Sequence, residues 1–171
     1  MDLEDQEILQ KRARMIRGRK KEKASPVESL LAVEFMLIPE KYAFDSIYVS
    51  EVMMLHNLTT IPGTPSFIVG IMNVRGSIIS VIDLKIFFNL PMKGISSFNK
   101  LLIVKHQQME FGIITDEIVG TRQIDIHTLS APPGTLRGVG ADFIQGITPD
   151  GTILLNASNI FSDNSLIINQ K

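Results

Sequence analysis

The two halves of this 171-residue chain repeat one another. The segment Leu30–Val33 reads LLAV and is echoed by LLIV at 101–104, while FIVGI at 67–71 is echoed by FIQGI at 143–147. A fixed internal repeat means that one structural unit is used twice, so it constrains the architecture before any motif is considered. We therefore expect two related lobes rather than one unrepeated core.

Short apolar runs rich in Ile, Val and Phe alternate with Gly, Pro, Asn and Asp along most of the chain. This pattern is typical of small all-β lobes. It predicts strands at 30–37, 42–47, 50–54, 70–74, 77–82, 101–105, 110–115, 119–124, 144–148 and 152–155. Turn residues predict tight connections at 39–41, 75–76, 106–108 and 150–151.

Each repeat ends in a polar residue that precedes a short helical pattern, Asp83 before 84–88 and Asn156 before 157–161. Asp and Asn suit this position because their side-chain oxygens accept hydrogen bonds from the first amides of a helix. The predicted fold is all-β, with two barrel lobes packed side by side and short helices at the lobe ends. Two such lobes are expected to leave an apolar groove between them and strand edges for partners.

The leading segment is strongly basic, with eight Lys and Arg against one Glu in residues 11–23. Leu9, Ala13 and Ile16 follow helical spacing, and Ser25-Pro26 interrupts the pattern. We expect a basic N-terminal extension over 1–29 that includes a helix. Four interpretations stay open: a solvated helix, a docking helix, a contact with acidic lipid, and nonspecific attraction to nucleic acid.

Several functional classes are disfavoured by composition. The chain has no cysteine, and His56, His106 and His127 lack the paired spacing of metal ligands. No nucleophile motif or phosphate loop occurs, so we expect neither catalysis nor a metal or cofactor. A basic, aromatic strand face for specific nucleic-acid binding is also missing. Apolar runs are too short for a transmembrane segment, which predicts a soluble, intracellular protein.

The segment 61–84, with Asn73-Val74-Arg75-Gly76 at its centre, resembles the signature of the CheW family around its Asn-Leu-Arg-Gly turn. Further resemblance lies at 42–44, 49–52, 111–116 and 138–155. The similarity implies a CheW-like domain over 30–163, with the signature at 61–84 and a C-terminal tail at 164–171.

Membership of this family implies two intertwined SH3-like barrels and a non-catalytic adaptor in chemotaxis signal transduction. The implied partners are the regulatory domain of the histidine kinase CheA and the cytoplasmic tip of chemoreceptors (methyl-accepting chemotaxis proteins), with other CheW-like domains as a further class. Such an adaptor is expected in the cytoplasm, held at membrane-associated receptor arrays through its partners. The alternative is a specialised scaffold for a chemosensory pathway that controls surface motility or gene regulation.

The resemblance also assigns partner-binding positions, namely Val49, Glu51, Gly70, Asn73, Arg75, Gly76, Lys100, Leu101 and Thr121. It further predicts a Glu51–Arg75 ion pair. Other roles stay open: the two glycines can serve the backbone, Asn73 can shape its turn, and Leu101 can belong to the core.

Overall fold

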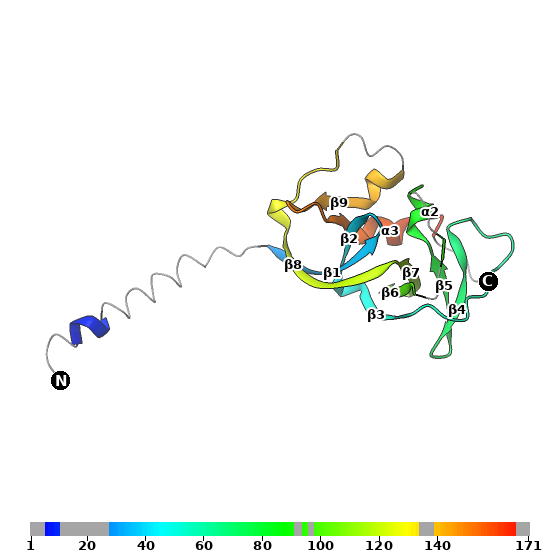
Figure 1. Cartoon of the computed structure of the whole chain (residues 1–171), viewed down its shortest axis with the longest axis horizontal. Helices are drawn as coiled ribbons and strands as arrows, with labels where there is room; N and C mark the ends of the chain where they lie inside the picture. The colour runs from blue at the N-terminus through cyan, green and yellow to red at the C-terminus, as the bar shows by residue number, and fades with distance from the viewer. Residues whose placement is uncertain (1–5, 11–27, 91–93, 96–97, 134–138, 167–171) are drawn as a thin grey trace.

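The computed structural model describes residues 6–10, 28–90, 94–95, 98–133 and 139–166. Its body consists of two five-stranded sheets packed together with two short helices (Figure 1). The strands are β1 (Ser29–Leu37), β2 (Glu40–Asp45), β3 (Val49–Met54), β4 (Ile68–Val74), β5 (Ser77–Ile82), β6 (Lys100–His106), β7 (Met109–Thr115), β8 (Glu117–Asp125), β9 (Ile144–Ile147) and β10 (Ile153–Leu155). The helices are α2 (Leu84–Phe87) and α3 (Ala157–Ser162), with 3-10 turns at Ser46–Tyr48, Ile126–Thr128 and Val139–Phe143. Every expected strand is present, and the all-β prediction is confirmed.

The two halves of the chain exchange strands. The sheet orders are β8-β1-β2-β10-β9 and β3-β6-β7-β5-β4. Each sheet thus takes its β1–β2 or β6–β7 hairpin from one half of the sequence and its other three strands from the other half. The two halves meet where β1 pairs with β8 and β2 with β10 in one sheet, and where β6 pairs with β3 and β7 with β5 in the other. The pairings of β2 with β10 and of β7 with β5 are parallel, and they are the parallel seams. Neither half therefore forms a complete lobe alone.

Corresponding positions in the two lobes follow from the hairpin registers. Leu37 pairs with Glu40 in the first hairpin, and His106 pairs with Met109 in the second. Counting back from these turns, Ala32 corresponds to Leu101. The LLAV and LLIV segments are thus out of structural register by two residues. A slip of two is invisible in an apolar pattern because alternate side chains still face the same way.

The second sequence echo is in structural register, and it closes each sheet into a barrel. Ile71 exchanges two backbone hydrogen bonds with Thr59, of 2.8 and 2.9 Å. Its counterpart Ile147 does the same with Ser130, at 2.9 Å each. The segment that follows β3 thus pairs with β4, and the segment that follows β8 pairs with β9.

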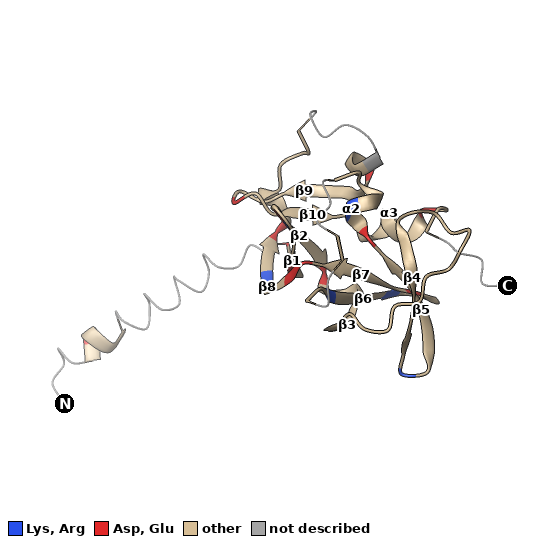
Figure 2. Cartoon of the chain, turned by 45° about the vertical axis from the view of Figure 1, so that its right-hand side comes forward, with Lys and Arg blue, Asp and Glu red and all other residues tan. Residues whose placement is uncertain are grey.

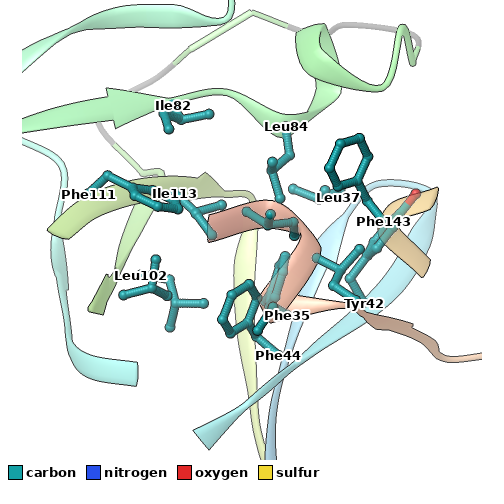
Figure 3. Close-up of a cluster of buried hydrophobic side chains, with 14 of the residues drawn as sticks. Phe35, Leu37, Tyr42, Phe44, Ile82, Leu84, Leu102, Phe111, Ile113 and Phe143 are labelled. Carbon is teal, nitrogen blue, oxygen red and sulfur yellow. The ribbon is translucent and has the colours of Figure 1, made fainter. Parts of the chain in front are cut away.

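The main hydrophobic core lies between the two sheets (Figure 3). It combines side chains of both, such as Phe35 and Phe44 from one sheet and Leu102 and Ile113 from the other. Two smaller clusters fill the barrel interiors, one with Met72, Val74, Ile79, Val81, Leu101, Ile103 and Ile114 and one with Ala32, Ala43, Ile124 and Leu154. Where the sheets face each other, packed side chains occupy the space in which the sequence suggested an open apolar groove.

The predicted helix caps are confirmed. The Asp83 carboxylate accepts a hydrogen bond from the Lys85 amide at 2.9 Å, and the Asn156 side chain accepts one from the Asn159 amide at 3.1 Å. These bonds satisfy amides that have no partner within the helix.

Little of the basic extension falls within the described residues. Residues 6–10 are helical and exposed, whereas 11–27 lie outside the described part of the chain. At the other end, Leu166 is buried in the main core, and 167–171 are not described. Within the described ranges, no helix is long and apolar enough to span a membrane.

Candidate partner-binding site

The signature residues form the tip of the β4–β5 hairpin. Val74 pairs with Ser77, and the two residues between them, Arg75 and Gly76, have φ values of 51° and 84°. Positive φ at both central positions is the geometry of a type I′ turn, which matches the twist of the flanking strands. The Asn73 side chain accepts a hydrogen bond from the Gly76 amide at 2.9 Å. Asn73 and Gly76 therefore shape the turn that presents Arg75.

Arg75 reaches across the end of the first barrel to Glu51 on β3. Its Nη2 lies 2.8 Å from Glu51 Oε2, so the predicted ion pair is present. The Arg75 side chain is nevertheless 83% exposed, against 25% for Glu51. The β4–β5 hairpin projects away from the rest of the body, and its tip is coloured as basic (Figure 2). The arrangement presents a guanidinium to solvent in a defined direction.

Gly70 serves barrel closure rather than the exposed surface. It is buried on β4, and a β-carbon there would lie 2.4 Å from the Thr59 carbonyl oxygen. Its counterpart Gly146 is similarly confined, because a β-carbon would lie 2.8 Å from Leu129 Cβ. Both glycines permit the close backbone approach that joins the sheet edges.

Val49 and Lys100 lie on the paired strands β3 and β6, at different ends of the pairing. Val49 is half-buried at the start of β3, where it packs against the main core. Lys100 pairs with Met54 at the far end of β3, and its Nζ lies 2.7 Å from Met54 Sδ. Both are partly exposed, Val49 on the strand that carries Glu51 and Lys100 on the strand paired with it.

Leu101 and Thr121 do not join this surface. Leu101 has no exposed area and fills the first barrel, so the structure places it in the core, the other role that the sequence left open for it. The strand alternation points its side chain inward, where it packs on Gly112. Thr121 is exposed on β8, in the other sheet from the β4–β5 hairpin (Figure 1). A partner that contacts both Thr121 and Arg75 must span the two lobes.

Sequence reasoning missed a buried charge cluster beneath α2. Lys85 Nζ lies 2.5 Å from Asp116 Oδ2, with side chains 8% and 16% exposed. Asp116 also accepts a hydrogen bond from the Ile38 amide at 2.7 Å. Burial raises the pKa of nearby Asp83 above its ordinary value. The position of Lys85 soon after a capping residue gave no sign of burial, since its ion-pair partner Asp116 lies far away in the sequence.

A second missed cluster joins Glu34 on β1, Arg122 on β8 and Asp150 in the β9–β10 turn. Hydrogen bonds from Arg122 and then Thr148 hold the pKa of the Asp150 carboxyl well below its usual range, and the Asp150 partnership raises the pKa of Arg122. The one available sequence signal was an acid, Glu34, within the otherwise apolar run at 30–37. An acid at such a position requires a buried partner.

The histidines are dispersed in the structure. His56 Nδ1 lies 3.2 Å from Met72 Sδ, His106 packs against the rings of Tyr48 and Phe161, and His127 lies near Glu28. Among the described side chains, no group of three or more His, Asp or Glu is arranged to hold a metal ion.

The body is thus a pair of strand-exchanged barrels with an exposed, charged hairpin tip. Residues 32–165 match the model of the CheW-like domain family. The chain is 30% identical over 146 residues to chemotaxis protein CheW of Treponema pallidum, covering 81% of this chain and 86% of the relative. It is 27% identical over 138 residues to chemotaxis protein CheW of Bacillus subtilis, covering 79% and 85%.

The fold agrees with a solved relative. The crystal structure of the scaffolding protein TtCheW from Thermoanaerobacter tengcongensis matches with a TM-score of 0.69 and 34% identity, over 80% of this chain and 94% of that one. The chain belongs to the CheW-like domain family. It therefore has the two-lobe SH3-like fold and the non-catalytic coupling role in chemotaxis that the sequence predicted.

Proposed function

We propose that this chain couples chemoreceptors to the histidine kinase CheA, with one lobe on the kinase regulatory domain and the signature face on the receptor tip. Its location at receptor arrays then follows from these partners, and other CheW-like domains are a further partner class. Family membership and the exposed β4–β5 hairpin support the proposal. Receptor state reaches the kinase through differential contacts with each state of the adaptor.

The observation that carries the proposal is the exposure of Arg75 despite its ion pair with Glu51. An exposed pair of this kind contributes less than about 1 kcal/mol to folding. Its main effect is to fix the direction of a long, flexible side chain. A pre-oriented guanidinium loses less freedom on binding than an unrestrained one. Arg75, Glu51 and the turn residues Asn73 and Gly76 form the proposed contact set, with Val49 and Lys100 beside it.

The test is charge reversal at Arg75. We expect Arg75→Glu to weaken binding of a receptor tip or of the kinase regulatory domain by at least about tenfold, as expected for loss of a charged contact at an interface. Calorimetric titration against both partners from the source organism measures the effect. Lys105→Glu is the matched control, because Lys105 is exposed near the end of β6 and its replacement also lowers the net charge by two.

Wild-type binding to neither partner, with folded protein, would contradict the coupling function. Normal binding of both partners by Arg75→Glu would instead remove Arg75 from the contact set and leave the coupling function standing. Equal weakening by Lys105→Glu would indicate a general charge effect rather than a local contact.

The alternative, a scaffold for surface motility or gene regulation, uses the same fold. Relatives with other names also match, including Protein PilI of Pseudomonas aeruginosa at 28% identity over 99 residues. The same titration distinguishes the pathways when it includes each receptor and kinase of the organism. Saturable binding to only one receptor–kinase set assigns the output.

A further inference from the structure

The second lobe contains a buried acid whose charge is balanced from a neighbouring strand. Glu34 on β1 is 5% exposed, and its Oε1 lies 2.8 Å from Arg122 Nε on β8. Lys41 on β2 is also near, with Nζ 3.7 Å from Glu34 Oε2. A buried carboxylate is stable only when it is paired, so Glu34 requires these cations.

Arg122 also holds the β9–β10 turn. Its Nη1 donates to Asp150 Oδ2 at 2.8 Å and its Nη2 to Asp150 Oδ1 at 3.2 Å. This is the two-point geometry in which a planar guanidinium binds a carboxylate most strongly. Lys41 Nζ lies 3.5 Å from the same carboxylate. One arginine thus bridges a buried acid and a half-exposed acid.

The turn itself is fixed from within. Thr148 Oγ1 donates to Asp150 Oδ1 at 2.5 Å and accepts from the Thr152 amide at 2.9 Å. Thr152 has no exposed area. The position of Asp150 is therefore set by its own turn, and the turn is attached to the sheet through Arg122.

These residues come from both halves of the repeat. Glu34 and Lys41 belong to the exchanged β1–β2 hairpin, whereas Arg122 and Asp150 belong to the second half. The Glu34–Arg122 contact spans the pairing of β1 with β8, and Lys41 and Asp150 lie next to the parallel seam of β2 with β10. We propose that Glu34, Lys41, Arg122 and Asp150 form an electrostatic lock, a set of ion pairs that holds the exchanged β1–β2 hairpin in the second lobe. Because the buried Glu34 is negative, position 122 must carry the positive charge, and this order of charges is the polarity of the lock.

The first lobe provides a contrast. Its pair, Glu51 and Arg75, joins β3 to the tip of the β4–β5 hairpin. Here the acid is on the strand and the base is at the tip, the reverse of Arg122 and Asp150. By register, Glu51 corresponds to Gly120, so the two pairs do not occupy equivalent positions. Within the described part of the chain, no buried acid accompanies the first pair, and Arg75 is mostly exposed. The lock is therefore specific to the second lobe.

Removing the arginine tests the lock without any partner protein. We expect Arg122→Gln to lower the melting temperature by about 10 °C, because the negative charge of buried Glu34 loses its nearest cation. The double variant Glu34→Gln/Arg122→Gln should recover at least half of this loss, since no buried charge remains. The matched Arg75→Gln should shift melting by less than about 3 °C.

Exchanging the charges tests the polarity. We expect Glu51→Arg/Arg75→Glu to melt within about 3 °C of the wild type, because an exposed pair functions in either direction. Arg122→Glu/Asp150→Arg should melt at least about 10 °C lower, because the new acid would face Glu34. Equal tolerance of both exchanges would overturn the proposal.

Native-state hydrogen exchange locates the effect at the seam. In a variant that stays folded, Arg122→Gln or the milder Arg122→Lys, amides of β10 should exchange at least about tenfold faster relative to those of β5 at the opposite seam. Uniform acceleration at both seams, or none, would contradict a lock on the exchanged hairpin. Because these readouts use the protein alone, their failure leaves the proposed coupling function untouched.

Discussion

Gly70 and Thr59 approach so closely that a β-carbon on Gly70 would lie 2.4 Å from the Thr59 carbonyl oxygen. This contact accompanies the Thr59–Ile71 bridge that closes the first barrel and holds the signature hairpin near β3. The geometry of the candidate site thus depends on a buried residue behind the exposed hairpin tip.

Gly70→Ala should therefore destabilise the protein by about 2 kcal/mol, because backbone must move to relieve the overlap. Denaturant unfolding measures the loss. Gly140→Ala is the control, since its added carbon would meet only Phe88 Cδ1 at an ordinary 3.7 Å. Similar losses in both variants would show that closure tolerates a side chain at Gly70.

Leu101→Ala should cost about 2–5 kcal/mol by leaving a cavity in the first barrel. The neighbouring Lys100→Ala, at a half-exposed position, should cost less than about 1 kcal/mol. Urea unfolding of both variants distinguishes a core residue from a surface one. A small loss for Leu101→Ala would contradict its placement in the core.

Lys85→Met should destabilise by about 3 kcal/mol, because it leaves Asp116 without its buried cation. Adding Asp116→Asn should restore part of that loss, since the unbalanced charge is removed. Thermal unfolding of the single and double variants gives the coupling between the two residues. If the loss of stability in the double variant equals the sum of the losses in Lys85→Met and Asp116→Asn, the two residues have no interaction energy.

Acid should weaken the second lobe through Asp150. The pKa of this carboxyl is lower in the folded protein than in the unfolded chain, first because of Arg122 and then Thr148. Its stabilising effect is therefore present above the unfolded value of about 3.9 and is lost as the pH falls below it. Since the Asp150 side chain is 47% exposed, the effect should be modest and screened by salt.

Melting temperatures of the wild type and Asp150→Asn between pH 7 and pH 2 check this expectation. The variant should melt lower at neutral pH, and the difference should shrink as the solution becomes acidic. A constant difference across this range would show that ionisation of Asp150 does not contribute.

Local sequence chemistry was sufficient for the strands, the turns and the helix caps. Short apolar runs bounded by turn residues identified β4 and β5, and Asp83 and Asn156 marked the helix starts. The Glu51–Arg75 pair followed from resemblance to the family motif, not from spacing. Gly70 shows the limit of that inference, because a position in a motif does not reveal whether a residue faces a partner or another strand.

What the sequence by itself determined was the set of secondary structure elements and their repetition, because these depend on side-chain period and on the backbone preferences of turn residues. Only the tertiary structure decided that the β1–β2 and β6–β7 hairpins exchange sheets, that Ala32 rather than Leu30 corresponds to Leu101, and that Glu34 meets Arg122. These choices depend on pairing between residues far apart in the chain. An apolar repeat fits either lobe and tolerates a shift of two, so the free energy of packing the whole core selects among them.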